Sequence, residues 1–166
     1  MAVRRILGLS VFAGAAVIFV SVFLPWARIG AGFEDVHVEY HLDALQLHSA
    51  YGAHASPLDG VTILLAALAL AGVGVVLVSS RSRRLASRSI AVGMVALIVV
   101  AMAATFAPYP PTFANGPAAY EFVTKGIGPY LCLTGTAVCA MAFVGAILNA
   151  HATRVAHRAS LAVPPG

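Results

Sequence analysis

The chain has 166 residues, of which 60% are hydrophobic and only 10% are charged, and its formal net charge is +4 at pH 7. Soluble domains carry about 25% charged residues, so this chain has too little polar surface to cover a water-soluble globule. Its length, without internal repeats or linker-like segments, fits a single domain over residues 1–166. Composition therefore predicts an all-α membrane domain whose solvent is largely lipid.

Four apolar runs predict four transmembrane helices in chain order. The runs cover residues 6–26, 58–79, 90–108 and 127–150. Each is close to the ~20 residues that a helix needs to cross ~30 Å of hydrocarbon. The first run follows basic residues as a signal peptide would, but its length favours a retained anchor. Short connections make sequential spans antiparallel, so we expect an up-and-down four-helix transmembrane bundle.

Charged residues are segregated between the two sides of the predicted bundle. One side carries only arginines, namely Arg4, Arg5, Arg81, Arg83, Arg84, Arg88, Arg154 and Arg158. The first loop on the other side carries Arg28 and five carboxylates, namely Glu34, Asp35, Glu39, Asp43 and Asp59. Positive residues concentrate on the cytoplasmic side of membrane proteins, so both termini are predicted to be cytoplasmic. This bias explains the basic pI without a nucleic-acid partner, because no basic stripe is interleaved with stacking aromatics.

The outer loop at residues 27–57 is long enough to carry structure of its own. Residues 36–43 alternate strictly between apolar and polar side chains, which predicts a strand. We expect residues 23–29 to be its antiparallel partner, with Gly30, Ala31 and Gly32 in the turn. A short helix over residues 43–51 follows, and residues 117–124 in the second outer loop fit one or two helical turns. A small β-element should therefore cap the outer end of the bundle.

The polar face of the predicted strand carries side chains that bind transition metals. His37, Glu39 and His41 alternate along it, and His48 and His54 follow in the same loop. On one strand His37 and His41 lie roughly 13 Å apart at 3.3 Å per residue, so they cannot share one ion. Three interpretations stay open: a solvated face, a partner-binding face, and a zinc or copper site using His37, Glu39 and His41.

The interiors of the four runs contain no Asp, Glu, Lys, Arg or His, and Asp59 at the start of the second is interpreted as a helix cap. Ion pathways, proton relays and haem ligands within a bilayer usually need such groups. Hydrolase and nucleotide-binding motifs are also missing. The sequence therefore predicts no enzyme, no catalytic residue and no resident cofactor.

The fourth run carries small side chains at heptad spacing, which we call the small-residue seam: Gly128, Cys132, Gly135, Cys139, Ala142 and Ala146. Small residues let helix backbones approach closely in lipid. Ala67, Ala71 and Gly74 of the second run could offer a facing surface. The seam is expected to pack either inside the bundle or against another membrane protein.

Two further features concern the ends of the runs. Trp26 and Tyr130 lie near the predicted outer interface, where an aromatic belt would place them. Residues 151–166 are polar and end in Pro-Pro-Gly, which predicts a frayed cytoplasmic tail.

Three short motifs carry a resemblance: Leu24-Pro25-Trp26, Asp59-Gly60 and Gly128-Pro129-Tyr130-Leu131. With them the chain resembles uncharacterised four-span proteins of high-GC Gram-positive bacteria. Its layout, with strands in a long outer loop after the first span, is also similar to that of claudins, although the claudin loop cysteines are absent. The first resemblance implies a multi-pass protein of the bacterial cytoplasmic membrane and supplies no catalytic residue.

These observations favour a non-enzymatic accessory or structural subunit of a bacterial membrane protein complex. Its expected partners are membrane lipid and other membrane-protein subunits. Two alternatives remain: a metal-binding protein that uses the outer face, and a small transporter or channel subunit whose pore is lined by hydroxyl and backbone groups.

Overall fold

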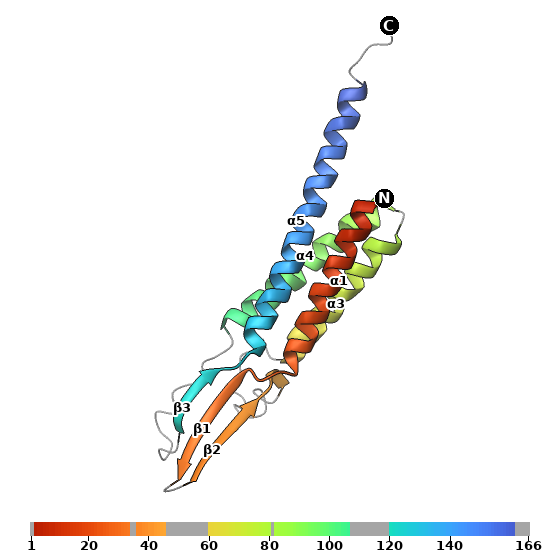
Figure 1. Ribbon diagram of the computed structural model, residues 1–166. Helices are drawn as coiled ribbons and strands as arrows, with labels where there is room; N and C mark the ends of the chain where they lie inside the picture. The colour runs from red at the N-terminus through yellow and green to blue at the C-terminus, as the bar shows by residue number, and fades with distance from the viewer. Residues whose placement is uncertain (1, 34–35, 46–59, 81, 107–119, 162–166) are drawn as a thin grey trace.

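The computed structural model describes residues 2–33, 36–45, 60–80, 82–106 and 120–161 (Figure 1). It contains long helices joined at one end to a small sheet. The helices are α1 (Ala2–Val22), α3 (Gly60–Ser79), α4 (Arg83–Phe106) and α5 (Gly128–Leu161). The strands are β1 (Ala27–Phe33), β2 (Val36–Leu42) and β3 (Tyr120–Lys125).

Within the described residues, four helices are long and apolar enough to cross a membrane, in agreement with the expected four spans. The crossing segments are Val3–Val22, Gly60–Ser79, Arg84–Thr105 and Gly128–Thr153. Their ends differ from the apolar runs because hydrogen-bonded helix continues into polar sequence. α4 begins at Arg83. In the turn before it the Ser80 hydroxyl donates to the Ser82 carbonyl oxygen, and the Ser82 hydroxyl accepts from the backbone N–H of Leu85 in the first turn of the helix. Residues 107–108, the predicted end of the third span, lie outside the described residues.

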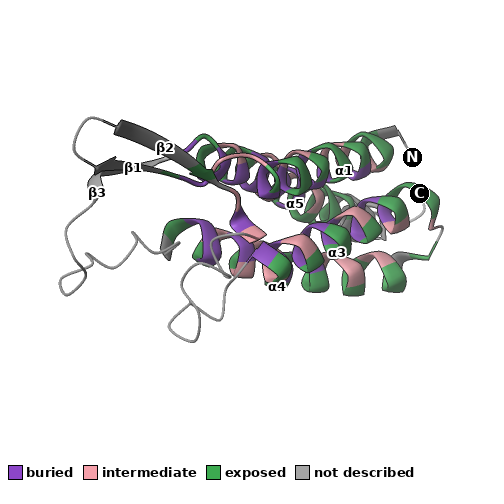
Figure 2. Ribbon diagram, turned by 90° about the horizontal axis from the view of Figure 1, so that it is seen from below, coloured by how far each residue is buried: buried purple, intermediate pink, exposed green. Residues whose placement is uncertain are grey.

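The helices form one bundle in which α1 packs most extensively, against α3 on one side and α5 on the other. α4 packs against α3 and α5 and is the least covered of the four helices, and exposed residues recur along its length in Figure 2. The core consists of aliphatic and small side chains, among them Val11, Ile18, Ile63, Leu70, Val100 and Cys139. In lipid, the apolar residues on the outer faces contact acyl chains and the core depends on close packing.

The strands form an antiparallel sheet in the order β2-β1-β3. β1 pairs with β2 from Ala27 opposite Leu42 to Phe33 opposite Val36. Gly30, Ala31 and Gly32 therefore lie within β1, and the prediction that they form the turn was wrong. Of the predicted partner segment 23–29, residues 27–29 pair with β2 and residues 23–26 precede the strand. Glycine in a strand often marks an irregularity, and the β1–β3 register shifts between Gly30 and Ala31.

Two further expectations are corrected by the structure. Residues 120–125 form β3 rather than a helical turn, because their aromatic and β-branched side chains suit a strand and β1 offers an edge to pair with. The polar tail is not frayed from residue 151, since α5 runs unbroken to Leu161. Alanine and arginine, both good helix formers, fill much of that extension. Of the predicted short helix over residues 43–51, Ala44 and Leu45 are helical, and residues 46–51 lie outside the described residues.

The two ends of the molecule are unlike each other (Figure 1). α1 begins and α5 ends at the same end of the bundle, where α5 extends well past the start of α1. The sheet projects from the opposite end, beyond the helices. Among the described residues, the sheet and the extension of α5 are the two parts that project beyond the bundle.

Candidate functional site

The sheet is attached to the bundle by a joint built from Ser21, Pro25, Trp26, Gly126 and Gly128, which we call the Trp26 joint. The Trp26 indole donates a 2.6 Å hydrogen bond to the carbonyl oxygen of Ser21. The backbone N–H of Gly126 donates to the Trp26 carbonyl and that of Gly128 to the Pro25 carbonyl, both at 2.9 Å. These bonds tie the root of β1 to the root of α5, so the two chain segments leave the membrane together.

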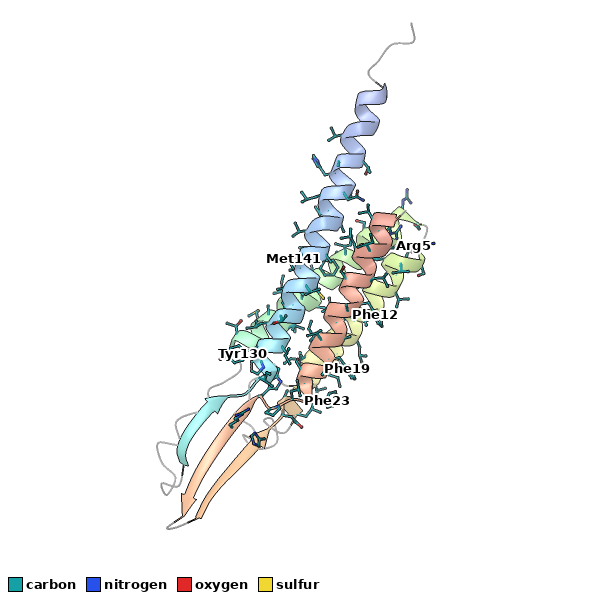
Figure 3. All side chains as sticks on the ribbon, in the orientation of Figure 1. Arg5, Phe12, Phe19, Phe23, Tyr130 and Met141 are labelled. Atoms are coloured by element: carbon teal, nitrogen blue, oxygen red, sulfur yellow. The ribbon has the colours of Figure 1, made fainter. Side chains whose placement is uncertain are left out.

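Glycine is required at both positions of the joint because there is no room for a Cβ atom. A Cβ on Gly126 would collide with the Pro25 carbonyl, and one on Gly128 would collide with the Trp26 indole. Trp26 is only 4% exposed, so its main contact is with this joint rather than with a lipid interface. Tyr130, by contrast, is 60% exposed at the sheet end of α5 (Figure 3), and the location of both aromatic residues at a lipid interface stays a prediction.

A second contact supports the sheet from the side of β2. Ala44, just past the end of β2, is buried, and its backbone lies against Gly60 at the start of α3. The Asp43 carboxylate accepts a 2.9 Å hydrogen bond from the backbone N–H of Leu45, which orders the exit from the strand. The sheet is thus fixed to the bundle at two places rather than hanging from a single strand.

The predicted metal ligands lie at alternate positions of β2. The register places His37 opposite Gly32, Glu39 opposite Gly30 and His41 opposite Arg28. Because glycine has no side chain, β1 offers no further ligand beside His37 or Glu39. Within the described residues, no group of three or more His, Cys, Asp or Glu could hold a metal ion. His48 and His54 lie outside the described residues, and the zinc or copper site stays a prediction.

The small-residue seam of α5 lies against α1 of the same chain. Gly128, Cys132, Gly135, Cys139 and Ala142 are buried and Ala146 is half-buried. At the crossing point a Cβ atom on Gly135 would lie 2.7 Å from the carbonyl oxygen of Gly14. The Cys139 thiol contacts the Val11 carbonyl oxygen at 3.5 Å. The sequence left open whether the seam packs inside the bundle or against another membrane protein, and in the structure it packs inside the bundle.

The sequence interpretation missed the helix that faces the seam. Gly74 of α3, suggested as part of the facing surface, instead meets Gly8 of α1, whose carbonyl oxygen would lie 3.0 Å from a Cβ at position 74. α1 therefore uses one glycine against α3 and another, Gly14, against α5. The buried residues of α1 follow heptad spacing, and that pattern was available in the sequence as a signal.

The few buried polar groups of the bundle bond to their own helices. The Ser21 hydroxyl donates to the Ile18 carbonyl at 2.6 Å, and the Thr136 hydroxyl donates to the Cys132 carbonyl at 2.8 Å. Apart from the buried guanidinium nitrogens of Arg4, Ser21 and Thr136 are the only buried polar side chains among the described residues. The part of the bundle that the structure describes is packed mainly with apolar side chains.

Comparisons with known proteins found no match, whether against protein-family models, curated proteins or solved structures.

Proposed function

We propose that this chain is a non-enzymatic accessory or structural subunit of a bacterial cytoplasmic-membrane complex, and that its sheet is the surface that binds the partner. The observation that carries the proposal is the Trp26 joint. A joint with two backbone hydrogen bonds, an indole hydrogen bond and obligatory glycines holds the sheet in a fixed position beyond the bundle. Such a preorganised surface loses little conformational freedom when a partner docks.

The sheet offers two kinds of recognition to a protein partner. Its order β2-β1-β3 leaves one edge of β2 and one edge of β3 without a paired strand in the described part of the chain. An exposed edge can accept an extended segment of another chain through main-chain hydrogen bonds. The first outer loop also carries five carboxylates against Arg28 alone. A partner with a basic segment would therefore be attracted to this end of the molecule.

The charge distribution orients the proposed complex. The end from which α1 starts carries arginines and no acidic side chain, whereas the opposite end carries the carboxylates. By the positive-inside rule both termini are then cytoplasmic, and the sheet lies on the outer side of the membrane. The partner domain is accordingly expected outside the cytoplasm.

Site-specific photocross-linking in native membranes tests this proposal. A photoreactive residue at Arg28, which is exposed on β1, should yield a discrete cross-linked protein larger than the chain itself. The matched control is Met141, which is 68% exposed in the middle of α5 and is expected to contact lipid.

Cross-linking from Arg28 and not from Met141 is the expected result. If neither position, nor His41 on β2, yields a protein adduct in native membranes, the sheet is not a docking surface and the proposal fails.

A further inference from the structure

We propose that Arg4 binds the phosphate group of an anionic phospholipid at the end of the bundle opposite the sheet. Because this end of the molecule lies far from the docking surface, lipid binding there holds or fails independently of the proposed function.

Arg4 occupies a core position of α1, unlike its neighbour. Besides Gly14 and Ser21, the buried residues of that helix recur at heptad spacing, namely Gly8, Val11, Ala15, Ile18 and Val22. Arg4 occupies the next position of this heptad pattern toward the start of the helix, so the aliphatic part of its side chain lies in line with the core residues. It is half-buried, whereas Arg5 is exposed at the side of the bundle (Figure 3).

One side of the Arg4 guanidinium group is buried and makes no hydrogen bond among the described residues. Its Nε and Nη2 atoms are buried and have no hydrogen-bond partner in the described part of the molecule. These two nitrogens carry the parallel N–H groups of one side of the fork, the arrangement that binds two oxygens of a carboxylate or phosphate. A buried charged donor without a partner is unfavourable, so turning this edge of the guanidinium outward to pair with an anion at the membrane surface lowers the free energy.

The chain offers no acidic side chain at this end. All six Asp and Glu residues lie between positions 34 and 59 or at position 121. Those that the structure describes, Glu39, Asp43 and Glu121, lie in or beside the sheet at the far end (Figure 1). The acidic side chains of the chain are therefore not available to Arg4, whereas an anion from outside the chain is.

The position of Arg4 favours a phospholipid as the source of that anion. Arg4 lies in the first turn of the crossing segment Val3–Val22, where a membrane-spanning helix passes the headgroups. The exposed cations Arg5, Arg84 and Arg88 lie at the starts of α1 and α4 and add attraction for an anionic lipid surface. Arginine rather than lysine suits this role, because its planar fork matches phosphate oxygens with two bonds.

Lipid-dependent thermal stability tests the site. The purified protein in neutral detergent is heated with a thiol-reactive dye, which labels Cys132 and Cys139 only when the bundle opens because both are 0% exposed. Phosphatidylglycerol should raise the opening temperature of the wild type more than phosphatidylcholine does. Arg4→Gln should remove this difference and weaken phosphatidylglycerol binding about tenfold, since hydrogen bonds to charged groups contribute that much. Arg5→Gln, the matched control, should keep the difference.

Further arms separate lipid binding at Arg4 from general surface charge and from free phosphate. Without added lipid, Arg4→Gln should open at the same temperature as the wild type or higher, because it removes an unpaired buried charge. If Arg4→Gln and Arg5→Gln lost the lipid effect equally, general surface charge would explain the effect and a specific site at Arg4 would be overturned. If inorganic phosphate or glycerol phosphate at matched concentration raised the opening temperature equally, the proposal that a lipid supplies the anion would be overturned. A lipid effect that Arg4→Gln leaves intact would overturn the site itself.

Discussion

A Cβ atom on Gly74 would lie 3.0 Å from both the Gly8 carbonyl oxygen and the Phe12 backbone nitrogen, whereas one on Gly72 would meet nothing within 4 Å. Both glycines belong to α3 and are two residues apart. The obstacle at Gly74 is backbone of α1, which cannot move aside as a flexible side chain would. The same logic applies where Gly135 meets Gly14. Single glycines on α1, α3 and α5 thus set how closely these helices approach.

The substitutions Gly74→Val and Gly72→Val should therefore differ in effect. Overpacking against backbone should cost Gly74→Val about 2 kcal/mol of bundle stability, whereas Gly72→Val should stay within about 0.5 kcal/mol of the wild type. The measurement is the temperature at which the buried thiols of Cys132 and Cys139 become reactive. Equal changes in the two variants would show that α1 and α3 do not cross at Gly74.

At the residue level, the sequence predicted more about α5 than about its partner. Heptad spacing picked out the small-residue seam on α5, because small side chains at a regular interval are visible in one helix alone. It did not show that α1 is the partner, because pairing depends on which helices become neighbours. The buried role of Trp26 was likewise hidden, since the contact joins residues about a hundred positions apart in the chain.

At the scale of elements, the sheet depends on a register that can be tested directly. Arg28 of β1 lies opposite His41 of β2. Facing residues in an antiparallel pair have Cα atoms about 4.5–5.5 Å apart, within the range that a disulfide bridges. The register therefore places positions 28 and 41 close enough for cross-linking.

The double variant Arg28→Cys/His41→Cys should form an intrachain disulfide in living cells if the sheet lies outside the cytoplasm, where disulfides persist. The control Arg28→Cys/His37→Cys should stay reduced, because its second cysteine is displaced by four residues, roughly 13 Å along the strand. Non-reducing gels with thiol counting distinguish the two. A disulfide in both variants would contradict the register. A disulfide in neither would contradict the location of the sheet outside the cytoplasm.

The extension of α5 is an element whose described side chains do not pack against the bundle. Residues 147–153 and Val155 are exposed, and the helix continues beyond the start of α1 (Figure 1). Removing residues 154–166 should therefore change bundle stability by less than about 0.5 kcal/mol, as for surface changes in general. The buried-thiol assay measures this as well. A clear drop in the opening temperature would show that the extension packs against the bundle.

The elements differ in how much of them the sequence could predict. Lipid-crossing helices are marked by long apolar runs, so their number was predictable, but their ends were not, because α4 and α5 continue through polar residues. The alternating residues 36–43 predicted a strand over the segment where β2 is found. β3 has only six residues and forms against an edge of β1 supplied by a distant segment, so local pattern alone could not distinguish it from a helical turn.

At the scale of the whole molecule, the two ends have different chemistry. One end combines the sheet, the Trp26 joint and most of the carboxylates, and the other combines the arginines with the unpaired edge of Arg4. Between them lies a bundle whose interior, over the described residues, is packed mainly with apolar side chains. This arrangement agrees with the proposal that the chain binds a protein partner at one membrane surface and lipid at the other.

The mass of the native assembly decides whether the chain is a subunit of a larger complex. Membranes containing the protein at its natural level are extracted gently, and the particle carrying the chain is weighed by native mass spectrometry. We expect a particle heavier than one chain with its lipids and containing at least one different protein, which is lost when Gly128→Val disrupts the Trp26 joint and displaces the sheet. A single, uniform monomer in the wild type would show that the chain works alone.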